Sequence, residues 1–549
     1  MRKNVLRFSI EIVKKTYILN KKQVILALLF IALLIQVVVL YTIRIDKPGI
    51  GYDEVRPTAS MAIYYRLHKS LDVPYINIFG TPVIFMRDGY IGGIEGSTYL
   101  FISRFISHPF LFRFMSIGFA VVTILLIYYI LNKLLRNSLI TYLATSAMAL
   151  SPTMVIFSRI GVNVNFSAVL FGTLLVVIFI QYIFTSSNRW LLLFVFIGGL
   201  SVGWVRLNLA WILISAAIYM ILFQRKDLRL FILSRNIISS ILLFLLGILP
   251  FIAYGLATSW STFQLIQNNA TQTSIFQHNN LDVLTNLIRR FFHIFSLLQF
   301  DVLWFPQTRA LSKYVPTLFF VTSSVWFSTQ LWKRAIKSRK RKILIFLFVV
   351  IITSLILSIF SVSNIKEMHL LIIYPTLYLF IILCMSEWIR NKYLLMGLLT
   401  FLLVSNMITT KQHVSILIET GGMGMFTDKI YELHEYLSDK SNEKIYYLDW
   451  GISENIYTLS NGGLSGKEIF QYQRVASSQF IEENWTELLR GYENVLIVAR
   501  SKDEALFPDR TDQLAFFLAK NELSLQTDKI IYVQGVPQFI VYSLIQTTN

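Results

Sequence analysis

The adjacent acids Asp53 and Glu54 are the residues of this sequence best suited to carry chemistry. They lie in the segment 51–57, shortly after the first long apolar run of the chain. Carboxylates just outside a membrane can place a general base at the depth of a lipid phosphate, where it would take a proton from an acceptor hydroxyl. A structural alternative is that Asp53 caps a helix starting at Pro57 and Glu54 complements the helix dipole.

Further polar side chains gather where the apolar segments end on the same side of the predicted bundle: Arg56, Asp88, Glu95, Arg159, Asn163, Arg206, Asn208, Lys366 and His369. Basic groups of this kind hold phosphate oxygens, and Arg does so in bidentate fashion. The alternatives are also open: a first-turn glutamate at Glu95, snorkelling side chains at Arg159 and Lys366, and an ordinary interfacial histidine at His369. Arg206 could simply bind backbone carbonyls.

Composition places the chain among polytopic membrane proteins. Hydrophobic residues make up 55% of its 549 residues, and 43 of them are Phe. Soluble domains contain fewer apolar residues. The single cysteine, Cys384, excludes a disulfide within one chain and a cysteine-based metal site. No Asp or Glu lies in the middle of an apolar segment, which argues against a proton-coupled carrier but not against an uncoupled scramblase.

Eleven apolar segments are long enough to cross about 30 Å of hydrocarbon. They lie near 23–43, 112–131, 139–157, 166–184, 190–204, 207–223, 237–257, 314–332, 343–361, 369–388 and 393–409. The fifth and sixth are nearly continuous, but Arg206 and Asn208 between them predict two helices with a polar break.

Charge predicts the orientation of this bundle. The part up to residue 409 has 38 Lys and Arg against 12 Asp and Glu, whereas 410–549 has 12 against 19. The basic clusters fall in alternate loops, which predicts a cytoplasmic N-terminus and an external C-terminal tail. The first apolar run is too long for a cleavable signal peptide. Basic loops of this kind meet membrane lipids, and we expect no nucleic-acid partner.

The chain therefore divides into a membrane module, 1–409, and an external α/β domain, 410–549. The module has two long external segments. The first, 44–111, is expected to hold interfacial helices from Pro57 and from Glu95 to Ser107. The second, 258–313, is rich in amides and aromatic residues, which suit sugars or any wet interface. The tail shows strand and helix patterns that alternate and end in a hairpin near 529–544.

Several short motifs in this order resemble the GT-C glycosyltransferases, in particular the bacterial branch related to protein O-mannosyltransferases and aminoarabinose transferases. The motifs are Tyr52-Asp53-Glu54, the segment 90–96, Ser158-Arg159-Ile160-Gly161, the segment 368–375 that ends in Tyr-Pro, and Asp449-Trp450-Gly451. The resemblance implies a GT-C-like polytopic helical fold and transfer of a sugar from a polyprenyl-phosphate carrier with inversion.

By this resemblance, Asp53 is the general base and Glu54 orients it or the acceptor. Arg56, Glu95, Arg159, Lys366 and His369 are then expected to bind the donor phosphate or the substrate. Two departures concern that second set. Many family members have an acid after the Ser-Arg pair, where this chain has Asn163 and Asn165. Many have Arg-Tyr before the late Pro segment, where this chain has Met368-His369.

The expected protein is a multi-pass enzyme of the bacterial inner membrane that acts at its outer face on a glycan, lipid or protein acceptor. No His, Asp and Glu cluster has metal-ligand spacing, but Mg²⁺ or Mn²⁺ held by Asp53 or Glu95 with the donor phosphate is compatible with the sequence. Two alternatives remain: a transferase that uses a lipid-pyrophosphate glycan, and a scramblase or assembly subunit without catalytic activity.

Overall fold

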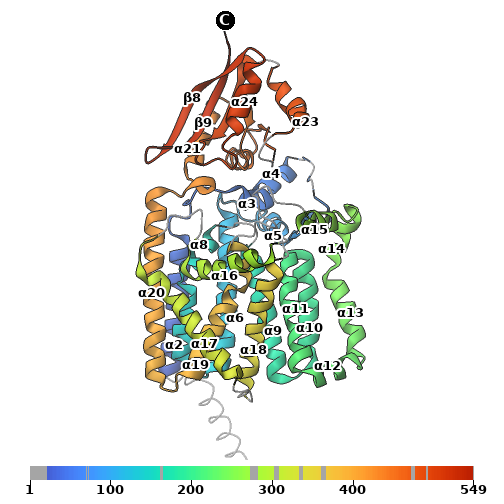
Figure 1. Ribbon diagram of the computed structural model, residues 1–549, viewed down its shortest axis with the longest axis vertical. Helices are drawn as coiled ribbons and strands as arrows, with labels where there is room; N and C mark the ends of the chain where they lie inside the picture. Colours follow the sequence, from blue (N-terminus) through green and yellow to red (C-terminus); the bar gives the residue numbers. More distant parts are fainter. Residues whose placement is uncertain are drawn as a thin grey trace, which may run out of the picture.

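Long apolar helices run side by side in the computed structural model, and a small α/β domain covers one end of the bundle (Figure 1). The structure describes residues 21–67, 69, 71, 73–160, 165–271, 282–301, 308–332, 338–359, 367–471, 476–489 and 492–547. Lys366 and Asn163, which the sequence analysis singled out, lie outside these residues, as do 272–281 and 302–307 of the second long segment. Below, the covered end is called the domain side.

The helices follow the eleven predicted apolar segments closely. They are α2 (Lys21–Thr42), α6 (Leu111–Leu135), α7 (Ser138–Ala149), α8 (Pro152–Arg159), α9 (Asn165–Thr185), α10 (Asn188–Leu200), α11 (Ala210–Phe223), α12 (Arg225–Ile232), α13 (Asn236–Gly247), α14 (Leu249–Ala257), α17 (Val315–Trp332), α18 (Arg339–Ile359), α19 (Tyr374–Trp388) and α20 (Lys392–Thr420). Among the described residues, six helices are long and apolar enough to span a membrane, or nine if each bent pair is one span. The chain is thus multi-pass, and the number eleven stays a prediction.

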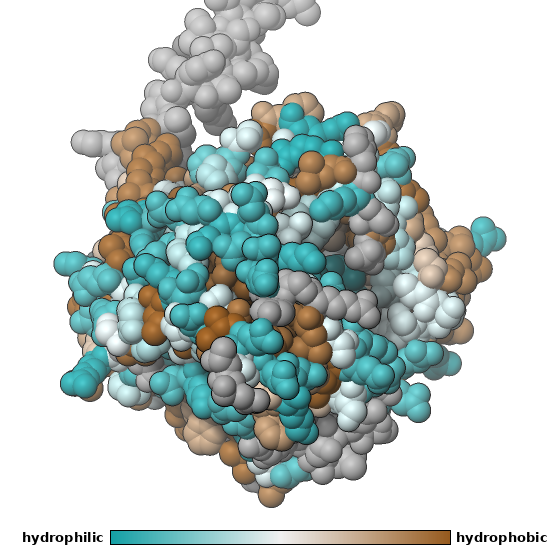
Figure 2. Space-filling view, turned by 90° about the horizontal axis from the view of Figure 1, so that it is seen from above, coloured by the Kyte–Doolittle hydropathy of each residue, from teal (hydrophilic) through white to brown (hydrophobic). Residues whose placement is uncertain are grey.

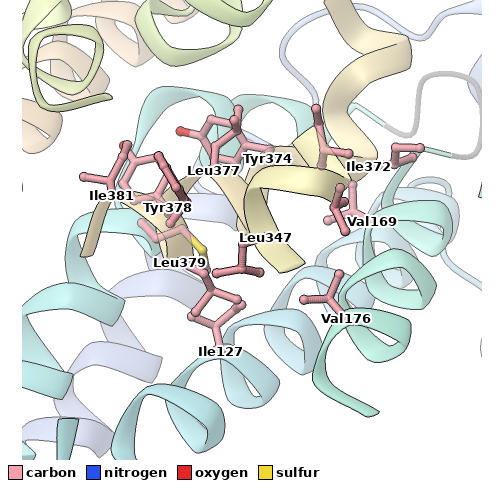
Figure 3. Packing of buried hydrophobic residues seen from close by; sticks show 14 of the residues in the cluster. Ile127, Val169, Val176, Leu347, Ile372, Tyr374, Leu377, Tyr378, Leu379 and Ile381 are labelled. Atoms are coloured by element: carbon pink, nitrogen blue, oxygen red, sulfur yellow. The ribbon is translucent and has the colours of Figure 1, made fainter. Parts of the chain in front are cut away.

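The centre of the bundle is formed by α19. Together with the 3-10 turn η6 (Glu367–Ile373), it is the most enclosed candidate span, with 94% of its apolar window buried. Tyr374, Tyr378 and Leu377 belong here to the same buried cluster as Val169 of α9 and Leu347 of α18 (Figure 3). A helix that is apolar all round belongs in such a position, because every face meets another helix.

The predicted polar break between the fifth and sixth spans is confirmed. After α10 the backbone forms a π turn, η3 (Ser201–Val205), becomes extended at Arg206, and resumes through the 3-10 turn η4 (Leu207–Leu209). Arg206 forms an isolated antiparallel bridge with Ile91, and the Leu207 amide donates to the Tyr90 carbonyl at 3.1 Å. The first loop therefore occupies the backbone groups that the break exposes.

The first loop contains more structure than the sequence indicated. Its helix begins at Tyr52, not at Pro57: α3 (Tyr52–Val55) continues through a π turn, η1 (Arg56–Ser60), into α4 (Met61–Arg66). Pro57 lacks an amide hydrogen, so the wider turn tolerates it inside the helix. Asp53 thus lies in the first turn and does not cap a helix at Pro57.

Two short hairpins, which were not predicted, lie between this helix and the next. They are β1 (Tyr75–Ile78) with β2 (Thr81–Ile84), and β3 (Met86–Asp88) with β4 (Ile91–Gly92). The following helix, α5 (Ile94–Ile102), ends earlier than the predicted Ser107. In the second long segment, α15 (Ser261–Thr271) and α16 (Val283–Gln299) lie at the domain side, where α16 runs across the bundle (Figure 1).

The C-terminal domain has a mixed five-stranded sheet in the order β6-β5-β7-β9-β8. Its elements are α21 (Lys429–Ser438), β5 (Lys444–Tyr447), α22 (Ser453–Leu459), β6 (Lys467–Glu468), β7 (Val495–Arg500), α24 (Arg510–Ala519), β8 (Leu523–Val533) and β9 (Val536–Gln546). Strands β5, β6 and β7 are parallel, and β8 and β9 form the predicted hairpin. The last bundle helix, α20, continues to Thr420, so the predicted boundary at 409 falls inside it.

This domain is packed onto the first loop through a shared core. Ile50 and Val55 of the loop join Ile430, Ile456 and Val541 of the domain in one buried cluster. Hydrophilic residues predominate on the outer surface at this end (Figure 2). The domain therefore holds α3 and α4 from above while the bundle holds them from below.

Candidate active site

Asp53 lies in a cluster of opposite charges that three segments bring together. Arg87 of β3 contacts Asp53, with 3.9 Å between Nη2 and Oδ1, and its Nε donates to Asp88 at 2.8 Å. The Asp53 side chain is 18% exposed, whereas that of Arg87 is 7% exposed. Among the described residues, Nη1 of Arg87 is buried and has no hydrogen-bond partner. The cluster thus offers a carboxylate and a free buried donor.

The break between α10 and α11 adds Arg206 to this cluster. Its side chain is 2% exposed and interacts electrostatically with Tyr90, Asp53 and Glu95. Glu95, in the first turn of α5, is 7% exposed and accepts a hydrogen bond from the Ser167 amide of α9 at 3.4 Å. The structure therefore brings Glu95 and Asp53 around Arg206, as part of what we call the reaction cluster: Asp53, Arg87, Asp88, Glu95 and Arg206.

Two glycines make this close approach feasible. A Cβ on Gly92 would lie 2.0 Å from the Trp204 carbonyl oxygen, and one on Gly96 would lie 2.7 Å from the Pro57 carbonyl oxygen. Neither position leaves space for a side chain. The glycines of the segment 90–96 thus allow β4 to reach the break and α5 to reach the helix that carries Asp53.

Burial raises the pKa values of two acids of this cluster. It raises the pKa of Asp53 above its ordinary value; the Arg87 guanidinium opposes this rise, and the Asp88 carboxylate adds to it. Burial also raises the pKa of Glu95 to about 7, against the hydrogen bond from Ser167. A carboxylate with a raised pKa is a stronger base when it is ionised, which suits proton removal from a hydroxyl.

Glu54 has a different environment from its neighbour. Its two oxygens accept from Nε and Nη2 of Arg113 at 2.9 and 3.0 Å, and both side chains are fully buried. Arg113 also donates to the carbonyls of Ile45, Pro48 and Gly49 at 2.6 to 3.0 Å. We call this group the clamp. Neither carboxylate oxygen of Glu54 is free for a substrate, so its role in this structure is to hold the loop.

Arg159 also braces the loop. Its Nη2 donates to the carbonyls of Ile43, Arg44 and Lys47 at 2.6, 2.7 and 3.1 Å, and the residue is 0% exposed. This arrangement places it with the clamp and not with Asp53. Its Nε and Nη1 are buried and have no hydrogen-bond partner among the described residues, so the expectation that Arg159 binds the donor phosphate stays a prediction.

The remaining predicted residues lie around the reaction cluster. Arg56 is exposed; it donates to the Tyr52 hydroxyl and lies 5.2 Å from the centre of that ring. Tyr52 in turn packs on Trp450 of the domain at 4.7 Å. His369 is half-buried, and its carbonyl accepts from Asn208 next to the break at 3.4 Å. Both residues are thus close to the cluster without being at its centre.

An apolar groove of about 530 Å³ lies beside the cluster, between β2 and the helices α10, α13 and α14. Phe85 and Trp204 line it, and the Trp204 indole donates to the Ile84 carbonyl at 2.7 Å. Two residues further along each of these segments, Arg87 and Arg206 join the reaction cluster. The groove and the charges are therefore built on the same two pieces of backbone.

A divalent cation held by Asp53 or Glu95 stays a prediction. Among the described residues, no three His, Cys, Asp or Glu side chains are grouped as ligands. The Arg87 guanidinium contacts both Asp53 and Asp88 and supplies the positive charge that a cation would bring there.

Sequence reasoning missed the importance of Arg87 and Arg113. Arg113 had a detectable signal, because a charged residue near the start of an apolar span rarely occurs without a partner. Arg87 is one of several loop residues, and only the fold brings it to Asp53. Arg206 was recognised as a break but not as the centre of the charges.

Comparison with known proteins gives a fold and no sequence family. No family model matches the chain, and a search among curated proteins finds no match. Among solved structures, ArnT from Cupriavidus metallidurans is similar, both bound to undecaprenyl phosphate and in the apo state. Each match has a TM-score of 0.58 and 10% identity, and covers 93% of this chain and 97% of that one.

The chain has an ArnT-like fold. This confirms the predicted fold class, a polytopic helical module with a small C-terminal α/β domain. The match extends over almost the whole of both chains, so the domain belongs to the shared architecture. At 10% identity it gives the fold alone, and the activity must be argued from the site.

Proposed function

We propose that this protein transfers a sugar from a polyprenyl-phosphate carrier to an acceptor hydroxyl at the outer face of the bacterial inner membrane. The observation that carries the proposal is the junction of an apolar groove with a charge cluster around Asp53. Phe85 and Trp204 line the groove, and Arg87 and Arg206 follow them in the cluster. A donor with a long hydrocarbon chain and a phosphate head fits this arrangement, with its chain in the groove and its phosphate at the cluster. The ArnT neighbour was solved with undecaprenyl phosphate, which is a ligand of that chemistry.

In the proposed reaction, Asp53 is the general base. The acceptor oxygen attacks the anomeric carbon of the sugar while its proton passes to Asp53. The bond from that carbon to the phosphate oxygen breaks, and polyprenyl phosphate leaves with the electron pair. Attack opposite to the leaving group inverts the configuration. General-base assistance of this type contributes about 10²–10⁴-fold.

Arg87 and Arg206 are proposed to stabilise the departing phosphate. Arg87 has a buried Nη1 without a partner among the described residues, and such a donor is suited to a phosphate oxygen. Positive charge placed in advance of the reaction stabilises the developing anion without reorganisation. Glu95, Arg56 and His369 are proposed to position the substrate around these groups. Lys366 remains a predicted phosphate ligand.

A divalent cation on Asp53 or Glu95 also remains a prediction, and the proposed chemistry does not require it. Arg87 already offsets part of the negative charge of Asp53 and Asp88. The proposed partners are the lipid-linked donor, surrounding membrane lipids and a hydroxyl acceptor on a glycan, lipid or protein.

The proposal is tested with purified protein, radiolabelled polyprenyl-phosphate sugars and membrane acceptors, with the Asp53→Asn variant in parallel. We expect transfer by the native protein and a large loss in the variant. Equal transfer by both would refute Asp53 as the base. No transfer with any donor, combined with movement of the lipid across vesicle membranes, would favour the scramblase alternative.

A further inference from the structure

A second cavity lies between the first loop and the C-terminal domain, apart from the reaction cluster. It measures about 600 Å³ and is lined by α4, α5, the segment before α6, and α22. Its polar lining comes from Arg66, Arg104, His108, Tyr65 and Asn461. Among the described residues, none of the reaction cluster lines it, and neither does any Asp or Glu. The described part of the wall therefore carries basic groups and no acidic one.

The position of the cavity along the chain places it at the membrane boundary. His108 lies three residues before Leu111, where the candidate span α6 begins. The His108 ring packs on Phe114 of that helix, with 5.0 Å between the ring centres. A side chain at the end of a spanning helix lies at the depth of lipid headgroups. The cationic lining is thus within reach of lipid phosphates.

Apolar side chains project next to this cavity. Phe79 at the tip of the β1–β2 hairpin is 96% exposed, and Phe105 and Ile106 are 75% and 52% exposed. Arg104 donates to the Phe79 carbonyl at 3.1 Å, which ties this tip to the cavity wall. Exposed aromatic residues at headgroup depth gain free energy by entering the acyl boundary. The arrangement combines an apolar edge for acyl chains with basic groups for a phosphate.

We propose that this cavity binds the phosphate headgroup of an anionic membrane lipid, through Arg66 and Arg104, with its acyl chains along Phe105 and Ile106. Basic groups at a membrane surface attract anionic lipids. The proposal does not depend on the sugar-transfer activity, because the cavity shares no residue with the reaction cluster.

The bound lipid would also hold the C-terminal domain in place. Arg66 donates to Asn461 of the domain, and Thr458 of α22 lines the same cavity. Thr458 also exchanges a hydrogen bond with Ser60 at 2.7 Å, so the domain and the loop already meet here. A phosphate that bridges Arg66 and Arg104 would add to this interface, and the lipid would raise the thermal stability of the whole chain.

The test measures retention of phosphatidylglycerol and of phosphatidylcholine on the purified full-length protein by native mass spectrometry. Four proteins are compared: the native chain, Arg66→Gln with Arg104→Gln, the charge-preserving Arg66→Lys with Arg104→Lys, and Arg189→Gln, an exposed residue distant in sequence. We expect the native chain, the double Lys variant and Arg189→Gln to retain phosphatidylglycerol in preference to phosphatidylcholine. We expect at least about tenfold weaker binding in the Gln variant, since two charge-assisted bonds are lost.

Thermal unfolding with and without phosphatidylglycerol completes the test. The lipid should raise the midpoint of the native protein and not that of the Gln variant. His108→Gln replaces that variant if it does not fold, and it should weaken binding in the same direction. Equal retention of the two lipids, or unchanged binding in a folded Gln variant, would overturn the proposal. So would binding of inorganic phosphate with no preference for phosphatidylglycerol, because the site would then be one for a free anion.

Discussion

The clamp around Glu54 and the reaction cluster around Asp53 each join a carboxylate to an arginine, one position apart, yet they differ in how deeply the carboxylate is buried. In the clamp, Arg113 binds both oxygens of Glu54 at 2.9 and 3.0 Å and three backbone carbonyls. In the cluster, Arg87 is 3.9 Å from Asp53, which remains partly exposed. A carboxylate that is fully buried against its arginine fixes structure, whereas a partly exposed one can be reached by a substrate.

The difference arises from helix geometry. Successive residues of α3 point about 100° apart, so Asp53 and Glu54 face different neighbours although they are adjacent. One faces β3 and the break at Arg206, and the other faces the start of α6. The clamp then makes the cluster possible, because it fixes the backbone from which Asp53 projects.

The largest expected effect is on catalysis. Asp53→Asn should reduce transfer by about 10²–10⁴-fold, because it removes the base and leaves the clamp intact. Transfer from a radiolabelled donor measures this, with thermal unfolding as the check on folding. The matched control is Asp46→Asn, since Asp46 is partly exposed and pairs only with Arg44 among the ion pairs described. A similar loss in the control would mean that loop charge in general, and not the base, sets the rate.

Breaking the clamp should lower the stability of the protein. Arg113→Met leaves Glu54 buried without its partner and should cost about 3–5 kcal/mol in the free energy of unfolding. Adding Glu54→Leu removes the orphaned charge, so the double variant should recover part of the loss. Denaturant or thermal unfolding in detergent provides the measurement. If the single variant is as stable as the native chain, the clamp does not hold the loop.

The pH dependence of transfer distinguishes the effects of Asp88 and Arg87 on the pKa of Asp53. Activity needs the ionised carboxylate, so it should fall as the pH drops through the raised pKa of Asp53. Removing the Asp88 charge should lower that pKa and move the acid limb to lower pH in Asp88→Asn. Removing the Arg87 charge should raise it and move the limb to higher pH in Arg87→Gln. Profiles of kcat/KM record both, and shifts in the same direction would contradict the assigned neighbours.

The smallest expected effect is that of metal removal. Treatment with EDTA, followed by assay in metal-free buffer, should leave transfer unchanged, because Arg87 and Arg206 supply the positive charge of the cluster. Added Mg²⁺ or Mn²⁺ serves as the control. Loss of transfer with EDTA and its recovery with Mn²⁺ would show that the cluster needs a cation in addition to its arginines.

Much of the fold could be predicted from the sequence. The lengths of the apolar segments predicted the long helices, and the polar residues Arg206 and Asn208 predicted the break between two of them. The alternating patterns of the tail predicted the strands of its sheet except the two-residue β6. The short hairpins of the first loop were missed, since strands of two to four residues have too little periodicity to be recognised.

The sequence by itself determined that the chain is a multi-pass membrane protein with a polar α/β tail and a pair of acids after its first span. These properties follow from composition and local periodicity, which act along the chain. Only the tertiary structure decided that Asp53 meets Arg87 while Glu54 meets Arg113. These partners are separated by tens of residues, and their pairing depends on which face of α3 each acid takes and on what packs against that face.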